Sequence, residues 1–140
     1  MKVENLRSPN DKVGGIVYFG RMLDKIRLHA QGKLPPDYHE NLGKAFDDRC
    51  VKLLGVSYVD LVARTKMGGA DEEILGWCFE KGRKPGEDDV MIWNNFMSKR
   101  GWRDEASEVL KQRKEKFGLS QRQDVQTFFD LIDADEGRLK

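Results

Sequence analysis

The predicted fold rests mainly on residues 15–31, which read GIVYFGRMLDKIRLHAQ. Its apolar residues recur at steps of three and four positions, so they fall on one side of a helix. These residues are Ile16, Phe19, Leu23, Ile26 and Ala30. Gly14-Gly15 breaks the chain before the stretch, and Gly32 is a natural helix end. The stretch therefore predicts an amphipathic helix whose apolar face lies against a core.

Elsewhere in the chain the same spacing of apolar residues predicts further helices, each followed by a connection that contains glycine. One helical region runs over about residues 37–54 with a break near Gly43. The later helices are predicted to begin at polar or acidic residues, namely Ser57, Asp71, Glu87, Asp104 and Ser120. Phe117 is expected to face inward, and strand-like alternation is absent. The sequence thus predicts an all-α fold, a compact single-domain bundle of six or seven helices spanning residues 1–140.

The two ends of the chain are expected to differ from the bundle. Residues 1–13 predict an extended lead-in, because Ser8-Pro9 and Asn10-Asp11 form turns and disfavour helix. Residues 133–140, after the last apolar helical pattern, are expected to form a loose tail.

Composition narrows the class of protein. The chain has 140 residues, enough to bury a sizeable core without a disulfide or a metal. Its 25 basic and 24 acidic side chains nearly cancel, which argues against nucleic acid or an anionic membrane as the main partner. Cys50 and Cys78 lie in apolar helical patterns and are expected to be free thiols. We expect a cytoplasmic protein without a cofactor, a signal peptide or a membrane span.

The first helix also carries polar residues beside its apolar face. At 100° per residue, Arg27 lies about 40° and Asp24 about 100° from Leu23, with Gly20 between them. A gap beside an arginine can admit the carboxylate or phosphate of a ligand. Alternatively, Asp24 and Arg27 pair with each other, and Gly20 admits a neighbouring helix.

The histidines and cysteines give weaker evidence for a functional site than the Asp24–Arg27 flank does. His29 can titrate near neutral pH and act as a general base, although a lone helical histidine is more often a surface residue. The spacing of His29, His39, Cys50 and Cys78 fits neither a C-x-x-C nor an H-E-x-x-H pattern. The sequence therefore predicts no metal site.

WNNFMSKRGW, residues 93–102, is the second unusual stretch. Trp93 and Trp102 can form the walls of a pocket, with Arg100 nearby. The alternative is that Trp93 belongs to the core and Trp102 anchors a helix to its loop, because tryptophan is a large apolar residue. In either case, this segment is a candidate to face the Asp24–Arg27 flank.

The residues also resemble a known family. RSPNDKVGGIVYFGRMLDKIRLHAQGKL, FDDRCVKLLGVSYVDLVA and GWCFEKGRKPGEDDVMIWNNFMSKRGWRDEA resemble a small bacterial family catalogued as domain of unknown function 5069. The likeness covers about residues 6–118, and the segment after Ser120 is expected to be particular to this chain. The resemblance implies a small stand-alone helical protein and supplies no activity and no catalytic residues.

The sequence leads to a hypothesis of binding. We expect a domain that binds a small anionic ligand or a protein partner, with Asp24, Arg27, His29, Trp93, Arg100 and Trp102 as candidate site residues. One alternative is a small enzyme with an acid–base site on the first helix. Another is a structural homo-oligomer, such as a homodimer, with an apolar interface. A ligand site at Arg27 would require that this guanidinium lack sufficient partners within the protein.

Overall fold

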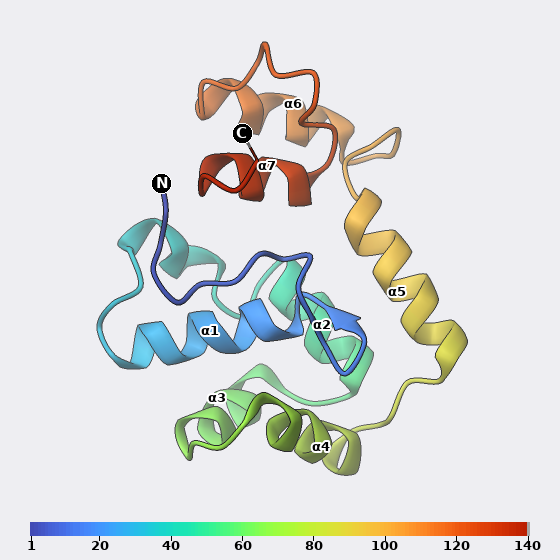
Figure 1. The fold of residues 1–140 in the computed structure, drawn as a ribbon. Coiled ribbons are helices and arrows are strands. Elements are labelled where there is room, and N and C mark those ends of the chain that lie inside the picture. Colours follow the sequence, from blue (N-terminus) through green and yellow to red (C-terminus); the bar gives the residue numbers. More distant parts are fainter. Residues whose placement is uncertain (140) are drawn as a thin grey trace.

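A computed structural model describes residues 1–139. Within them the chain forms a two-stranded hairpin, seven α-helices and one 3-10 helix, η1 (Figure 1). In chain order the elements are β1 Lys12–Val13, β2 Ile16–Val17, α1 Phe19–Ala30, η1 Pro36–Asn41, α2 Phe46–Leu54, α3 Tyr58–Lys66, α4 Asp71–Lys81, α5 Glu87–Lys99, α6 Ser107–Lys116 and α7 Phe128–Asp135. The predicted all-α class is confirmed.

Helix α1 lies at the centre of the molecule. Figure 1 shows α3 and α4 on one side of it and α7 on the other. Phe19 and Leu23 are fully buried, as the helical spacing predicts, and so is Met22, which lies outside the predicted core face. They belong to the main core cluster, which also includes residues of α2, α3, α4, α5 and α7. Helix α1 therefore contributes both the core face and, as described below, most of the buried charge.

The start of the first helix differs from the prediction. Ile16 and Val17 form strand β2, which pairs antiparallel with β1 in the register Lys12–Val17 and Val13–Ile16. Gly14 and Gly15 connect the strands with φ angles of +57° and +80°. A two-residue turn with two positive φ angles matches the twist of a hairpin, so the chain folds back before α1 begins at Phe19. Ile16 is buried as predicted, but in a strand.

Some predicted helix boundaries are confirmed. A break near Gly43 does separate η1 from α2. Ser57 caps α3, since its Oγ accepts a hydrogen bond from the Asp60 amide at 3.1 Å. Helix α5 begins at Glu87 with three acidic residues in its first turn, where they interact favourably with the helix dipole.

Helix α4 does begin at Asp71, but Ala70 holds the cap position and the Asp71 carboxylate pairs with arginines. The other predictions in this part of the chain were wrong. The last helix does not begin at Ser120; it begins at Phe128, where the Thr127 Oγ1 accepts from the Asp130 amide at 3.0 Å. Phe117, expected to face inward, is exposed. Several polar residues between Ser120 and Thr127 can begin a helix, so local signals alone do not fix where α7 starts.

Helix α6 and the segments on either side of it form a second, smaller core. Asp104 lies before the helix rather than at its cap and accepts hydrogen bonds from the amides of Gly101 and Ala106, both at 2.9 Å. Leu110, Val125 and Leu131 form this cluster. No helix within residues 1–139 has the length and apolar character that crossing a membrane requires.

Candidate functional site

The Asp24–Arg27 flank of α1 is part of a four-residue ion network. The Arg27 guanidinium lies 3.6 Å from Asp24 Oδ1 but only 2.8 Å from Asp71 Oδ1. The closest partner of Asp24 is Arg7 of the lead-in, whose Nε, Nη2 and backbone amide donate to its carboxylate at 2.9, 3.0 and 2.9 Å. Arg7 also donates to Asp71 at 2.7 Å. Two arginines and two aspartates therefore neutralise one another.

The space beside Gly20 is filled by Arg7. A Cβ atom on Gly20 would lie 2.8 Å from the Cζ atom of Arg7, and Arg7 Nη2 donates to the Gly20 carbonyl at 3.1 Å. Neither a ligand nor a neighbouring helix, the two occupants that the sequence suggests, takes this position. Arg7 was missed because it lies 17 residues from Asp24 in a segment without helical periodicity. Arg27 thus has partners within the protein, contrary to what a ligand site there requires.

We predict that Gly20→Ala destabilises the protein although alanine favours helix. The added methyl group displaces the Arg7 guanidinium, which Asp24 and Asp71 hold in place, and we expect a loss of about 1–3 kcal/mol in the free energy of unfolding. Gly76→Ala in α4 is the matched control, because nothing lies within 4 Å of its Cβ position. It should stabilise by about 0.5–1 kcal/mol. Urea unfolding measures both, and a stabilising Gly20→Ala would contradict the described network.

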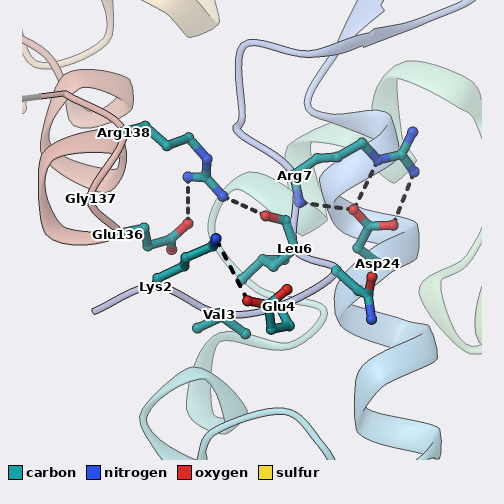
Figure 2. Close-up of a pocket in the computed structure, with 10 residues that line it drawn as sticks. Lys2, Val3, Glu4, Leu6, Arg7, Asp24, Glu136, Gly137 and Arg138 are labelled. Atoms are coloured by element: carbon teal, nitrogen blue, oxygen red, sulfur yellow. Dashed lines mark hydrogen bonds and ion pairs between the residues drawn. The ribbon is translucent and has the colours of Figure 1, made fainter.

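A cavity of about 620 Å³ lies between the lead-in, α1 and the C-terminal segment (Figure 2). Its charged lining residues are Lys2, Glu4, Arg7, Asp24, Glu136 and Arg138. Figure 2 shows the two arginines turned toward carboxylates of the protein: Arg7 pairs with Asp24, and Arg138 donates to Glu136 at 2.7 Å. Arg138 also donates to the carbonyl of Leu6. The three cations are balanced by three carboxylates, so the cavity offers no net charge to an anion.

Glu136 forms a buried ion pair with Arg21 of α1. Both of its oxygens accept from Arg21, at 2.8 and 2.7 Å, and both side chains are almost completely buried. Tyr38 donates to Glu136 at 2.8 Å. Burial alone would raise the pKa of Glu136, but hydrogen bonds and charge, chiefly from Arg21, lower it below the ordinary 4.5.

The expectation of a loose tail over residues 133–140 is therefore wrong for its described part, 133–139. Besides Glu136, this segment contributes Asp133, which accepts from Ser8 Oγ at 2.9 Å and from Asn10 Nδ2 at 3.0 Å. Its residues are mostly polar and lack a helical apolar pattern, which is why the sequence predicts disorder. Their charges instead pair with residues of the lead-in and α1 more than 100 positions away.

A second buried polar cluster lies on the opposite flank of α1. Lys25 Nζ donates to Asp47 Oδ1 and to the Tyr18 hydroxyl, both at 2.8 Å, and Tyr18 donates to Asp47 at 2.6 Å. Burial lowers the pKa of Lys25 and raises that of Tyr18. Tyr18 has a φ of +75°, an uncommon value for a residue other than glycine. The groups satisfy one another and line none of the cavities described here, so we interpret the cluster as structural.

The two histidines lie together at the surface. His29, near the C-terminal end of α1, and His39 in η1 have ring centroids 4.8 Å apart at an interplanar angle of 73°. His39 Nε2 is 2.9 Å from the carbonyl of Leu34. Within residues 1–139 no group of three or more potential metal ligands comes together. His29 is thus not part of the Asp24 network.

The tryptophan segment separates into two environments. Trp93 is 7% exposed and its Nε1 donates to the carbonyl of Val17 at 3.1 Å, so it holds the hairpin against α5. Arg100 pairs with Glu105 at 2.8 Å and with Asp104 at 3.5 Å. Trp102 is 47% exposed in the loop between α5 and α6. Trp93 and Trp102 therefore do not form the walls of one pocket.

Trp102 does line a cleft of about 560 Å³, which we call the Trp102 cleft. It is formed by residues 101–103, one face of α6 and the segment 120–126, and its polar lining residues include Arg103, Ser107, Lys111, Glu115 and Gln126. The Arg103 guanidinium lies 5.2 Å from the Trp102 ring centroid. Within residues 1–139, neither Arg103 nor Lys111 lies within 4.0 Å of a carboxylate oxygen. The Trp102 cleft shares no lining residue with the cavity at Asp24.

The backbone at this cleft is unusual as well. Arg103 has a φ of +49° and Gly101 one of +98°. Left-handed backbone at a non-glycine residue is costly and is often found at ligand-binding positions. Lys114, at the inner side of the cleft, donates to the carbonyls of Arg122 and Val125 at 2.8 and 3.0 Å, so it fixes the segment 120–126 against α6.

One comparison with known proteins is informative. A family model described as Domain of unknown function (DUF5069) matches residues 3–138. The match extends past Ser120, so the C-terminal segment is part of the family domain and not particular to this chain. No curated protein matches the sequence. The matched range includes both ends of the Arg21–Glu136 ion pair and the whole Trp102 cleft.

Proposed function

The chain belongs to the DUF5069 family of domains of unknown function, and we propose that it binds a small organic anion in the Trp102 cleft. The supporting observation is that Arg103 and Lys111 line this cleft without a carboxylate partner among residues 1–139. The arginines on the Asp24 flank, by contrast, are paired within the protein. Binding is thus proposed at a different place from the first helix.

The lining indicates the kind of ligand. Ligand sites of about 300–1,000 Å³ usually combine apolar walls with a few polar groups that orient the ligand. Here an exposed indole provides a flat apolar wall, and a guanidinium and an ammonium provide donors for a phosphate or carboxylate. We therefore propose a ligand with an anionic group attached to a flat or aromatic part.

We propose that the protein binds this ligand without catalysing a reaction. We also propose that it is a cytoplasmic protein. On the first helix, where the enzyme hypothesis places an acid–base site, Asp24 already accepts three hydrogen bonds from Arg7, and His29 lies at the surface beside His39. Cys50 and Cys78 are buried free thiols, which suits a reducing compartment.

We predict that thermal unfolding measured with nucleoside monophosphates and aromatic carboxylates detects at least one stabilising ligand, and that pyrophosphate, which lacks a flat or aromatic part, stabilises less. At about one hundred times its dissociation constant, a ligand should add about 2.7 kcal/mol to stability. Arg103→Ala or Lys111→Ala should weaken binding about tenfold, the loss expected for one charged hydrogen bond. Tryptophan fluorescence also follows binding, because Trp102 is exposed, whereas Trp93 is buried and Trp77 is half-buried.

Arg113→Ala is the matched control, since Arg113 is an exposed cation on α6 that does not line the cleft. Its affinity should equal that of the unmodified protein. A shift that survives Arg103→Ala and Lys111→Ala but disappears in Arg27→Ala would overturn the proposal and return the site to α1. No stabilisation by any of these compounds would also contradict it.

A further inference from the structure

Helix α5 has an exposed apolar side that the proposed ligand site does not use. Its inner side carries Trp93 and Met97, both buried, and contacts β2 and α7. On the outer side Met91, Ile92 and Phe96 are 55%, 61% and 38% exposed. Figure 1 shows α5 at the edge of the molecule. Neighbouring exposed apolar residues of this size often mark a binding surface.

This side of α5 forms a groove with α2. The groove has a volume of about 390 Å³, with Leu53 of α2 on one wall and Ile92 and Phe96 of α5 on the other. Trp93 also lines the groove. Ile92 and Phe96 are four positions apart, so both project from the same side of the helix. The groove is therefore a short apolar slot between two helices.

The rim of the groove is mainly basic. The Arg49 guanidinium lies 5.3 Å from the Phe96 ring centroid, and Arg83 is fixed by a hydrogen bond from its Nε to the Leu53 carbonyl at 2.8 Å. Lys52 also lines it, in an exposed pair with Asp48 at 2.7 Å. The one carboxylate lining the groove is Asp89, which accepts from the Gly86 amide at 3.1 Å. Among residues 1–139 no carboxylate oxygen lies within 4.0 Å of a nitrogen of Arg49 or Arg83, so both guanidinium groups are available to an acidic partner.

We propose that this α2–α5 groove docks an acidic amphipathic helix of a partner protein. Apolar side chains at helical spacing would enter the slot beside Ile92 and Phe96, and carboxylates would reach Arg49 and Arg83. Helices bind apolar grooves in this way through anchors spaced by three and four residues. A second copy of the same face is a poorer occupant, because a two-fold interface would bring these basic rims together.

Fluorescence anisotropy with a synthetic helical peptide tests the proposal. The probe is a labelled peptide of about 18 residues with leucines at helical spacing and glutamates on the other positions. A matched peptide has lysines in place of the glutamates. The full chain should bind the acidic peptide, and Ile92→Ser and Arg49→Glu should each weaken binding at least about tenfold. Val59→Ser is the matched control: Val59 is also an exposed apolar residue but lies on α3, and its variant should bind normally.

Three results would overturn the proposal. The first is equal affinity for the acidic and the basic peptide, or no binding of either. The second is unchanged affinity in folded Ile92→Ser and Arg49→Glu variants, with folding checked by circular dichroism. The third is a preference for something else: a concentration-dependent dimer lost in Ile92→Ser, or binding to phosphatidylglycerol vesicles in place of the peptide. The Trp102 cleft shares no lining residue with the groove, so the two proposals fail independently.

Discussion

Replacing Glu136 by glutamine is expected to lower the free energy of unfolding by about 3–5 kcal/mol, because it leaves the charge of Arg21 buried without its partner. The Arg21 and Glu136 side chains are only 4% and 2% exposed. The two charged hydrogen bonds between them also connect α1 to the end of the chain. Urea unfolding followed by circular dichroism measures the loss.

Asp48→Asn is the control, since the Asp48–Lys52 pair has the same N–O distance of 2.7 Å but both side chains are exposed. It should change stability by less than about 1 kcal/mol. The double variant Arg21→Met, Glu136→Leu should recover part of the stability lost in Glu136→Gln, because it removes both buried charges together. An effect of Glu136→Gln as small as that of Asp48→Asn would contradict the buried pair.

The same carboxylate makes stability depend on pH. The pKa of Glu136 is lowered in the folded protein, and so is that of Asp71. The folded state therefore binds fewer protons than the unfolded state near the ordinary values of 4.5 and 3.8. Stability from these groups is complete above those values and is lost as the pH falls through the lower folded pKa values. Glu136→Gln should accordingly lose less stability between neutral and acidic pH than the unmodified protein.

The second large effect is expected at Asp47. Asp47→Asn should also cost about 3–5 kcal/mol, because the Lys25 ammonium would remain buried without a carboxylate. Asp47 accepts hydrogen bonds from Lys25, from Tyr18 and from the Gly43 amide, the last at 3.0 Å. Asparagine cannot accept all three with the same geometry and charge. Thermal or urea unfolding measures the loss.

Lys25→Met removes the ammonium charge but keeps an apolar side chain of similar length, so it separates the contribution of the charge to stability from that of packing. Combined with Asp47→Asn, it should cost less than the sum of the two single variants, because the two residues contact each other directly. Strict additivity in this double-mutant cycle would contradict the pairing. Retained stability in Asp47→Asn alone would mean that Lys25 is uncharged at the pH of measurement.

The features that could be predicted correctly are those that depend on residues close together in the sequence. The spacing of Phe19, Leu23 and Ile26 identifies the core face of α1, and Ser57 identifies the start of α3, since both signals act within one or two helical turns. The hairpin at Gly14-Gly15 was missed because its strands are only two residues long. Strands of that length carry no alternation to detect.

Asp24 was correctly singled out as a residue in an unusual position, but its role was not predictable. Its partner Arg7 lies in the lead-in, and Asp71 joins the network from α4. Only part of the Trp102 cleft could be predicted from the sequence. Trp102 was among the candidate site residues, whereas Lys111 is one of several charged residues of both signs on α6. Nothing local distinguishes Lys111 from the neighbouring Arg113.

The helical class, the apolar face of α1 and several breaks between helices could be predicted from the amino-acid sequence alone. Helical periodicity and glycine conformations act over a few residues, so they can be followed along the chain. Which charges pair with each other is visible only in the tertiary structure. Arg21 and Glu136 are 115 positions apart and Lys25 and Asp47 are 22 apart. The strength of such pairs depends on burial and distance, which arise only when the whole chain packs.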